Sequence, residues 1–560
     1  MISKLNLLVC LVFLLLMGNV KAQNNLKQDT FRVVKEYKPI LIDADKITFE
    51  PEISDTFKLE TKLDYTFIHK PQKVSFELEP IKPARIKGEP LVKLYNGYAR
   101  LGVGNVMLPF GEVYYSNKRS KKFAAGAHVK YLKQAELNDY EGSDFSKAHF
   151  EVFGKRFWKT NTLETKLAYD IHSLNYYGFY QLPTVQQIEL PTPELEQQYQ
   201  QLNADFRLKS TVQDSFNLRH DIDAHFHHLT NSSGNAEQQF KASGNLSQFV
   251  NRELYELEVL ADYNNYELSQ SSAILALKPQ ISTHGKNFRV KAGLSIYMNV
   301  ADQTDFHFYP LAEVKYNVIE DILVPYAGIE GKIERLNYQS IIRENPFVAE
   351  NIQLQNSNQE YNIYGGMRGT LSSDLSFNTS VARIRTSSDY FYLKSPIGNE
   401  ILGKDFNLTY DRLDEWQVKG EFIYRMGEKI KLFVLGEYFQ FETEQEAEAW
   451  HRPDVKVSLS GEYNLRHKLI ARASVFYWGE QYAQGVSAIT INQFNQITDR
   501  TFKVETLDPI VDLNLGFEYR YTKKLSAFIN FNNLAGINYQ KYQDYPLQGF
   551  NVWGGLTYGF

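Results

Sequence analysis

The feature that most constrains this chain is a strict alternation of apolar and polar residues over long stretches. In DVKVSLSGEYNLR (454–466), every second residue from Val455 to Leu465 is apolar or small, and the residues between them are polar. The stretch VDLNLGFEYRYT (511–522) repeats the pattern. Because successive side chains of a strand point to opposite faces, each stretch predicts a strand with one apolar and one polar face.

The length of these strands favours a membrane barrel over a soluble sheet. Many run for about 12 to 20 residues, enough to cross a tilted bilayer, whereas strands of soluble proteins typically have five or six. Aromatic residues make up 14% of the chain, with 37 Tyr and 37 Phe, as expected at a membrane interface. Beyond the N-terminus there is no second apolar run long enough for a spanning helix. We therefore predict an all-β fold, a large antiparallel transmembrane β-barrel; a soluble all-β secreted protein is a minor alternative.

Three parts are expected along the chain. Residues 1–22 predict a secretory signal peptide, with Lys4 before an apolar core and cleavage near Ala22. Residues 23–90 contain recurring prolines and scattered apolar residues, which predict a short extended N-terminal segment in the periplasm or the barrel lumen. The barrel is expected over residues 91–560. The sole cysteine, Cys10, falls in the signal peptide, so no disulfide or cysteine-ligated metal is expected.

The spacing of the alternating stretches predicts about 22 strands, an even number as in bacterial barrels. Tight turns alternate along the chain with long connections, such as 340–359, 443–453 and 485–502. Barrels of this kind keep periplasmic turns short and extracellular loops long. Residues 401–426 are interpreted as one long strand, because splitting them would reverse this order for all later connections.

The chain ends in NVWGGLTYGF, an alternating stretch whose last residue is aromatic. An unpaired strand edge is not tolerated in hydrocarbon, so the last strand is expected to close the barrel. Its predicted lipid-facing residues are Val552, Leu556, Tyr558 and Phe560.

The C-terminal 36 residues resemble those of TonB-dependent receptors, in which an Asn-Leu pair, a Tyr-containing loop, a Gly and a final Tyr-x-Phe follow one another. The corresponding residues here are Asn533, Leu534, Tyr539, Gly549, Tyr558 and Phe560. The resemblance implies a 22-stranded barrel in the outer membrane of a Gram-negative cell, inserted by the barrel assembly machinery.

The resemblance also implies a plug domain of well over a hundred residues before the barrel, and the stretch 23–90 is too short for one. A missing or reduced plug is therefore expected. Within that stretch DTFRVV (29–34) resembles the segment with which such receptors contact TonB, through Asp29, Thr30, Val33 and Val34. The alternative, which we favour, is an extended tail without that role.

Few sequence patterns indicate metal binding or catalysis. In RHDIDAHFHHL (219–229) the i, i+2 spacing places His225 and His227 side by side on one strand face, a candidate metal pair with Asp223. We favour the alternative that they are polar side chains of the lumen wall, and we expect no metal and no cofactor. The sequence has no phosphate loop, nucleophile elbow or HExxH motif, so no enzyme is expected.

The expected function is solute passage or uptake by a porin-like or receptor-like barrel. The alternative is a structural or assembly partner that binds an outer membrane lipoprotein or a secretion component. Expected partners are outer membrane lipids, the barrel assembly machinery, a small solute, and either TonB or a lipoprotein. The net charge of -5 gives no indication of a nucleic acid partner.

Overall fold

The computed structural model describes residues 94–117, 120–137, 140, 142–179, 195–211, 217–319, 322–395, 403–491 and 497–560. These residues belong to one compact unit, Pro90–Phe560. The predicted signal peptide, the 23–90 segment and the TonB-contacting stretch 29–34 lie outside the described residues.

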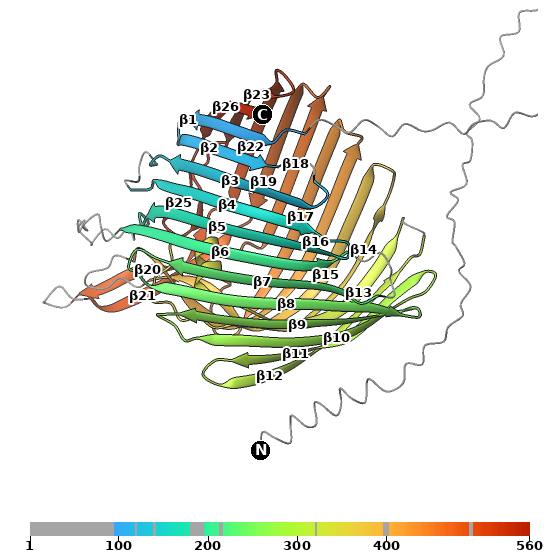
Figure 1. The fold of residues 1–560 in the computed structure, drawn as a ribbon. Coiled ribbons are helices and arrows are strands. Elements are labelled where there is room, and N and C mark those ends of the chain that lie inside the picture. The colour runs from blue at the N-terminus through green and yellow to red at the C-terminus, as the bar shows by residue number, and fades with distance from the viewer. Residues whose placement is uncertain are drawn as a thin grey trace, which may run out of the picture. The chain divides into compact units, whose positions relative to one another are not determined.

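The described residues form a closed, antiparallel sheet of 22 strands, as Figure 1 shows. Each strand pairs with its neighbours along the chain, which confirms the predicted fold class and strand number. The barrel strands are β1 (Gly97–Gly104), β2 (Met107–Ser116), β3 (Phe123–Gln134), β4 (Phe145–Phe157), β5 (Asn161–Asn175), β6 (Glu196–Ser210), β7 (Arg219–Thr230), β8 (Ala236–Val250), β9 (Glu253–Tyr266), β10 (Ser272–His284), β11 (Phe288–Val300), β12 (Thr304–Tyr316), β13 (Val324–Glu334), β14 (Ser357–Thr370), β15 (Leu375–Lys394), β16 (Phe406–Met426), β17 (Ile430–Thr443), β18 (Val455–Leu465), β19 (Leu469–Trp478), β22 (Ile510–Arg520), β23 (Leu525–Asn532) and β26 (Asn551–Gly559).

The barrel closes where the last strand meets the first. β26 pairs with β23 on one side and with β1 on the other, from Tyr98 opposite Gly559 to Gly104 opposite Trp553. The carbonyl of Phe560 accepts hydrogen bonds from the amides of Asn96 and Gly97, at 2.8 and 3.0 Å. A Cβ at position 97 would overlap the Phe560 ring, so this glycine lets the terminal aromatic lie against β1.

The two ends of the barrel differ in their connections. At one end, here the turn end, the connections are short, such as 158–160, 251–252, 427–429 and 466–468. At the other, here the loop end, lie the long connections, including 335–356, 444–454, 479–509 and 533–550. The predicted alternation of short and long connections holds for most of the barrel, but two loop-end connections, 105–106 and 301–303, are also short. β16 is a single strand, which confirms the interpretation of residues 401–426.

The side chains divide between the two faces as the alternation predicts. Apolar residues on the outer face are exposed, among them Leu101, Phe306 and Phe308, each more than 60% accessible. Polar residues of the inner face form ion pairs across strands, such as the bidentate contact of Arg207 with Asp221 at 2.8 and 2.6 Å. The exterior suits lipid and the interior suits water.

One local prediction is wrong. Residues 485–502, expected as a loop, are mostly a hairpin of β20 (Gln481–Ile491) and β21 (Ile497–Leu507), whose strands pair only with each other. The barrel strands on either side, β19 and β22, end at Trp478 and begin at Ile510, outside this hairpin. The alternating pattern marks any strand pair and does not separate those in the barrel from those beyond it.

One helix interrupts the β structure of the described residues: α2 (Tyr338–Glu344), in the connection between β13 and β14. This helix was not predicted, because residues 340–359 were expected to form a long connection. In the part of the chain described here, no helix is long and apolar enough to cross a membrane.

Candidate functional site

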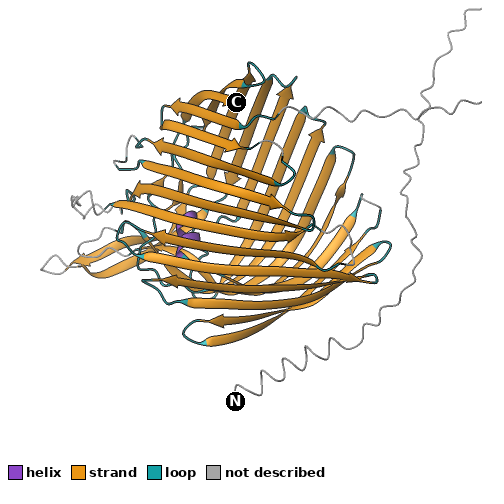
Figure 2. Ribbon diagram, viewed as in Figure 1, coloured by secondary structure: helices purple, strands orange, loops and turns teal. Residues whose placement is uncertain are grey.

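The connection between β13 and β14, residues 335–356, folds into the barrel and is here called the inner loop. Figure 2 shows its helix, α2, within the ring of strands. Ile341 and Val348 of the inner loop are fully buried. They belong to the largest apolar cluster of the described residues, to which β5, β6, β7, β9, β15 and β16 also contribute. Because a connection at the barrel rim would ordinarily be solvated, this burial shows that the inner loop packs inside the lumen.

Local sequence explains why a helix begins at Tyr338. The side chain of Asn337 accepts a hydrogen bond from the Ser340 amide at 2.8 Å, and the Ser340 hydroxyl accepts from the Asn337 amide at 3.2 Å. This reciprocal pair is a capping box, which satisfies amides that have no partner within the helix. Ile341 and Ile342 follow at once and turn to the apolar cluster.

The wall of the barrel completes the cap through Glu237 of β8. Its carboxylate accepts hydrogen bonds from the amides of Tyr338 and Gln339, at 2.7 and 2.8 Å. It also contacts Asn264 Nδ2 and His227 Nε2, each at 3.1 Å. Glu237 and His227 are both fully buried. A buried carboxylate is stable only when such partners replace its water, so Glu237 fixes the start of α2 to the wall.

Tyrosine hydroxyls hold the rest of the inner loop. The irregular backbone after α2 has carbonyl groups without ladder partners, and buried carbonyls need donors. Five tyrosines of the described residues supply them, donating from Tyr542 to Glu344 O (2.8 Å), Tyr199 to Pro346 O (3.0 Å), Tyr176 to Val348 O (2.9 Å), Tyr266 to Glu350 O (2.5 Å) and Tyr410 to Gln353 O (2.8 Å). The abundant tyrosine therefore also has a role inside the barrel.

The inner loop reaches a second wall at β16. Phe406, the first residue of β16, donates from its amide to Phe347 O at 3.0 Å and accepts from the Ala349 amide at 2.8 Å. This is a parallel bridge between Val348 and Phe406. Since β8 and β16 lie eight strands apart in the ring, the inner loop crosses the lumen and forms a partition near the loop end.

A second connection, residues 533–550, covers the partition from the loop end and is here called the capping loop. It carries β24 (Gln540–Tyr542) and β25 (Tyr545–Pro546). The Tyr545 ring stacks on Phe347 of the inner loop, with centroids 3.8 Å apart. Lys394 at the end of β15 forms an ion pair with Asp544. The capping loop is thus joined both to the partition and to the wall.

His451, in the connection 444–454, links this cover to its neighbour. Its Nδ1 lies 3.1 Å from Tyr392 O, and its Nε2 accepts from the Gln543 amide at 3.3 Å. Burial is the main cause that lowers the pKa of His451 to about 4; the nearby Lys394 and Lys541 contribute to this shift, and the hydrogen bond to Tyr392 O opposes it. The imidazole is therefore neutral at pH 7, with its proton on Nδ1.

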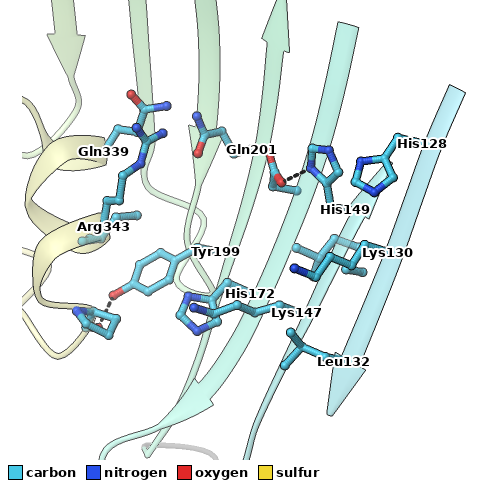
Figure 3. Close-up of a pocket in the computed structure, with 15 residues that line it drawn as sticks. His128, Lys130, Leu132, Lys147, His149, His172, Tyr199, Gln201, Gln339 and Arg343 are labelled. Carbon is cyan, nitrogen blue, oxygen red and sulfur yellow. Dashed lines mark hydrogen bonds and ion pairs between the residues drawn. The ribbon is translucent and has the colours of Figure 1, made fainter. Parts of the chain in front are cut away.

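Two cavities lie between the partition and the wall of β3 to β6. The larger, shown in Figure 3, has a volume of about 510 Å³. It is lined by strand residues such as Lys130, Lys147 and His172 and by Arg343 of α2. The smaller, of about 220 Å³, lies nearer the loop end and includes Lys541 of the capping loop. Both are in the size range of small-molecule sites or just below it.

The candidate metal residues contact different carboxylates. His225 Nδ1 lies 2.7 Å from Asp205 Oδ1, whereas His227 contacts Glu237 of the helix cap. Their rings are 5.8 Å apart, so the predicted juxtaposition is present. Among the described residues, no group of three or more His, Cys, Asp or Glu is arranged to hold a metal ion. His227 instead supports the anchor of the inner loop.

The C-terminal residues predicted to face lipid lie on β26 or directly after it. Leu556, Tyr558 and Phe560 are exposed, with 56%, 46% and 43% of their surface accessible, and Val552 is half-buried. The residues that fix the partition were not found from the sequence. Asn337 and Ser340, a capping-box spacing before two isoleucines, were the available signal for α2.

Comparisons with solved structures identify the same barrel in outer membrane receptors. The siderophore receptor PirA from Acinetobacter baumannii matches with a TM-score of 0.63 at 10% identity, over 84% of this chain and 81% of that chain. The FrpB iron transporter from Neisseria meningitidis gives 0.62 at 10%, over 84% and 82%. The pyoverdine outer membrane receptor FpvA from Pseudomonas aeruginosa gives 0.61 at 11%, over 84% and 79%. No family model and no curated protein matches the sequence.

These similarities establish the fold. The resemblance to TonB-dependent receptors that was predicted from the C-terminal residues is confirmed at the level of the barrel, and the matched proteins are receptors and transporters, not enzymes. Identities near 10% leave the solute and the residues that bind it to be argued from this chain itself.

Proposed function

We propose that this chain is an outer membrane β-barrel for solute passage or uptake, and that the inner loop closes its lumen. The observation that carries the proposal is the anchoring of the inner loop to two separate walls, by Glu237 of β8 and by Phe406 of β16. A barrel this wide has a lumen that wall side chains do not fill. A partition held by side-chain hydrogen bonds and one short backbone bridge can leave the lumen while the strand ladders of the barrel stay intact.

The remaining parts of the chain receive roles consistent with this proposal. Residues 1–22 direct export and are cleaved near Ala22. Residues 23–90 are the N-terminal segment in the periplasm or the barrel lumen, and the stretch 29–34 is the candidate contact for TonB. The C-terminal strand, with its exposed Leu556, Tyr558 and Phe560, is recognised by the barrel assembly machinery and then faces outer membrane lipid. The support for this arrangement is the apolar outer face of the barrel and its similarity in fold to the FrpB iron transporter and the siderophore receptor PirA.

Single-channel conductance in planar bilayers tests the proposal. Four proteins are compared: the full chain, a variant lacking residues 23–90, a variant in which residues 338–352 are replaced by a short Gly-Ser linker, and a variant with both changes. We expect large open steps once the inner loop is shortened, and small or rare steps in the full chain. If steps appear when only residues 23–90 are removed, the N-terminal segment is the main obstruction.

The matched control shortens the tip of the β20–β21 hairpin, residues 487–501, by the same number of residues. This hairpin pairs with no barrel strand, so its shortening should leave conductance as it is in the full chain. Silence of the loop-shortened barrel, with and without residues 23–90, would refute passage. That result would favour the alternative, a structural or assembly partner that binds a lipoprotein or a secretion component.

A further inference from the structure

The wall formed by β3 to β6 carries an excess of cations that face the larger cavity. Lys130 of β3, Lys147 of β4 and Arg343 of α2 all line it. Within the described residues, none of the three forms an ion pair with a carboxylate. Lys130 and Lys147 lie instead over the rings of Phe110 and Phe145, at 5.9 and 5.5 Å. Figure 3 shows them with Arg343 around the same space.

The acidic group of this cavity is already engaged. Asp170 of β5 contacts His149 Nδ1 at 2.6 Å through Oδ1 and accepts from Asn203 Nδ2 at 3.2 Å through Oδ2. Both of its oxygens are therefore held by wall residues. Two more histidines, His128 and His172, line the cavity and add hydrogen-bonding nitrogens.

Several cations elsewhere on the inner wall are paired with carboxylates. Lys278 lies 2.6 Å from Glu258, and Lys419 lies 3.3 Å from Glu437. Arg472 contacts Glu462 at 3.0 Å and Glu518 at 3.3 Å. Others, such as Arg100 and Lys456, lie over aromatic rings. The group beside the partition is distinguished by having three cations that line one cavity, whose described acidic residue, Asp170, is already engaged. Such a group of cations attracts negatively charged solutes into a cavity whose dielectric constant is lower than that of water.

The larger and the smaller cavity share part of their lining. Lys147, His172 and Pro346 line both. Lys147 and His172 are directly opposite each other in the β4–β5 pairing. On the same strands Phe145 is opposite Leu174 toward the loop end, and His149 is opposite Asp170 toward the turn end. The two cavities therefore lie on either side of the Lys147–His172 pair, beside the edge of the inner loop.

We propose that this wall binds a small organic anion with two or more carboxylate or phosphate groups, and that the anion passes the partition at Lys147 and His172. The inference rests on the proposed function, because it names the solute class for the same barrel. Lys541 provides a cation in the smaller cavity, on the loop-end side of the Lys147–His172 pair. Lys130 and Arg343 provide two more cations in the larger cavity, on the other side of this pair. The volume of about 510 Å³ exceeds what a single inorganic ion needs and suits a molecule that several cations contact at once.

Titration calorimetry with citrate on the purified full chain in detergent tests this assignment, with glucose as the uncharged probe. We expect citrate to bind at low ionic strength and to bind more weakly as salt is added, and we expect no heat from glucose. Lys147→Gln and Arg343→Gln should each lower the association constant about tenfold, which corresponds to about 1.4 kcal/mol. Neither side chain forms an ion pair that the barrel would lose among the described residues.

The control is Lys419→Gln, which removes the same charge from the inner face of β16 but lies outside this cavity. Its citrate affinity should equal that of the unaltered chain. Absence of citrate binding, or equal losses in all three variants, overturns the proposed site. If the loop-shortened barrel conducts but citrate does not bind, passage stands and the anion site fails; if citrate binds to a barrel that never conducts, the site stands and passage fails.

Discussion

Glu237→Gln should release the inner loop without disturbing the barrel strands. The substitution keeps the size of the side chain but replaces one acceptor oxygen by a donor. In either orientation of the substituted side-chain amide, the backbone N–H of Tyr338 or that of Gln339 then faces an NH2 group, which is also a donor. An amide left without its acceptor costs about 1–3 kcal/mol, and loss of charge assistance in the remaining bonds adds about 1 kcal/mol. A total near 3 kcal/mol raises the open fraction of the inner loop on the order of a hundredfold.

Limited trypsin digestion with mass-spectrometric mapping measures this fraction, because the bond after Arg343 is cleaved only when the inner loop has left the lumen. Cleavage at this bond should be faster in Glu237→Gln on the order of a hundredfold, since the cleavage rate follows the open population when reclosing is fast. Glu437→Gln is the control, because its carboxylate lies on the inner wall and contacts Lys419, not the inner loop. Equal cleavage rates in the two variants would show that Glu237 does not hold the partition.

Two further predictions concern the cover and the outer face. Burial keeps His451 neutral and lowers its pKa to about 4. Opening of the connection 444–454 exposes this side chain, which then takes up a proton at any pH below about 6.5. Acidification from pH 6.5 to 4 should therefore favour opening by up to about 3 kcal/mol. The protection factors of amides in residues 444–454, which correct for the pH dependence of intrinsic amide exchange, should fall over that range, and His451→Gln should remove the fall; protection factors that do not change with pH in the unaltered chain contradict the assignment. Leu556→Lys should destabilise the folded barrel by about 2–4 kcal/mol, or less near an interface, as measured by its urea midpoint. Asn530→Lys, which adds the same charge to the inner face of neighbouring β23, should have a smaller effect, and equal midpoints would refute the lipid-facing assignment of Leu556.

The barrel could be predicted because its determinants are local. The side chains of a strand alternate every two residues, and lipid on one side of the barrel makes the apolar stripe continuous. β18 and β22 can therefore be predicted from residues 454–466 and 511–522 alone. The order of short and long connections then decided that residues 401–426 form one strand. The β20–β21 hairpin was missed because its alternation continues the pattern of β19 and β22, with which it does not pair.

The partition could not be predicted because its partners are remote in sequence. Glu237 contacts amides about a hundred positions later in the chain, and Phe406 bridges to Val348 from another strand. No local period encodes such contacts. The spacing of His225 and His227 correctly placed two imidazoles on one face, but the partner that gives His227 its role lies on β8.

The way the partition is attached bears on how it opens. Its anchors are of three kinds: a charged carboxylate with several donors on β8, the backbone bridge to Phe406 on β16, and tyrosine hydroxyls whose bonds are worth about 1 kcal/mol each in net terms. Together with the burial of Ile341 and Val348, they make spontaneous opening rare. A bound solute can shift the inner loop toward the open state only by the difference between its binding free energies for the open and the closed state. Arg343 lies on the same helix as the amides held by Glu237, so an anion bound at Arg343 and Lys147 acts on α2 itself. The solute site and the anchor are therefore coupled through one short helix, and citrate should change the trypsin cleavage rate after Arg343 in the unaltered chain but not in Lys147→Gln.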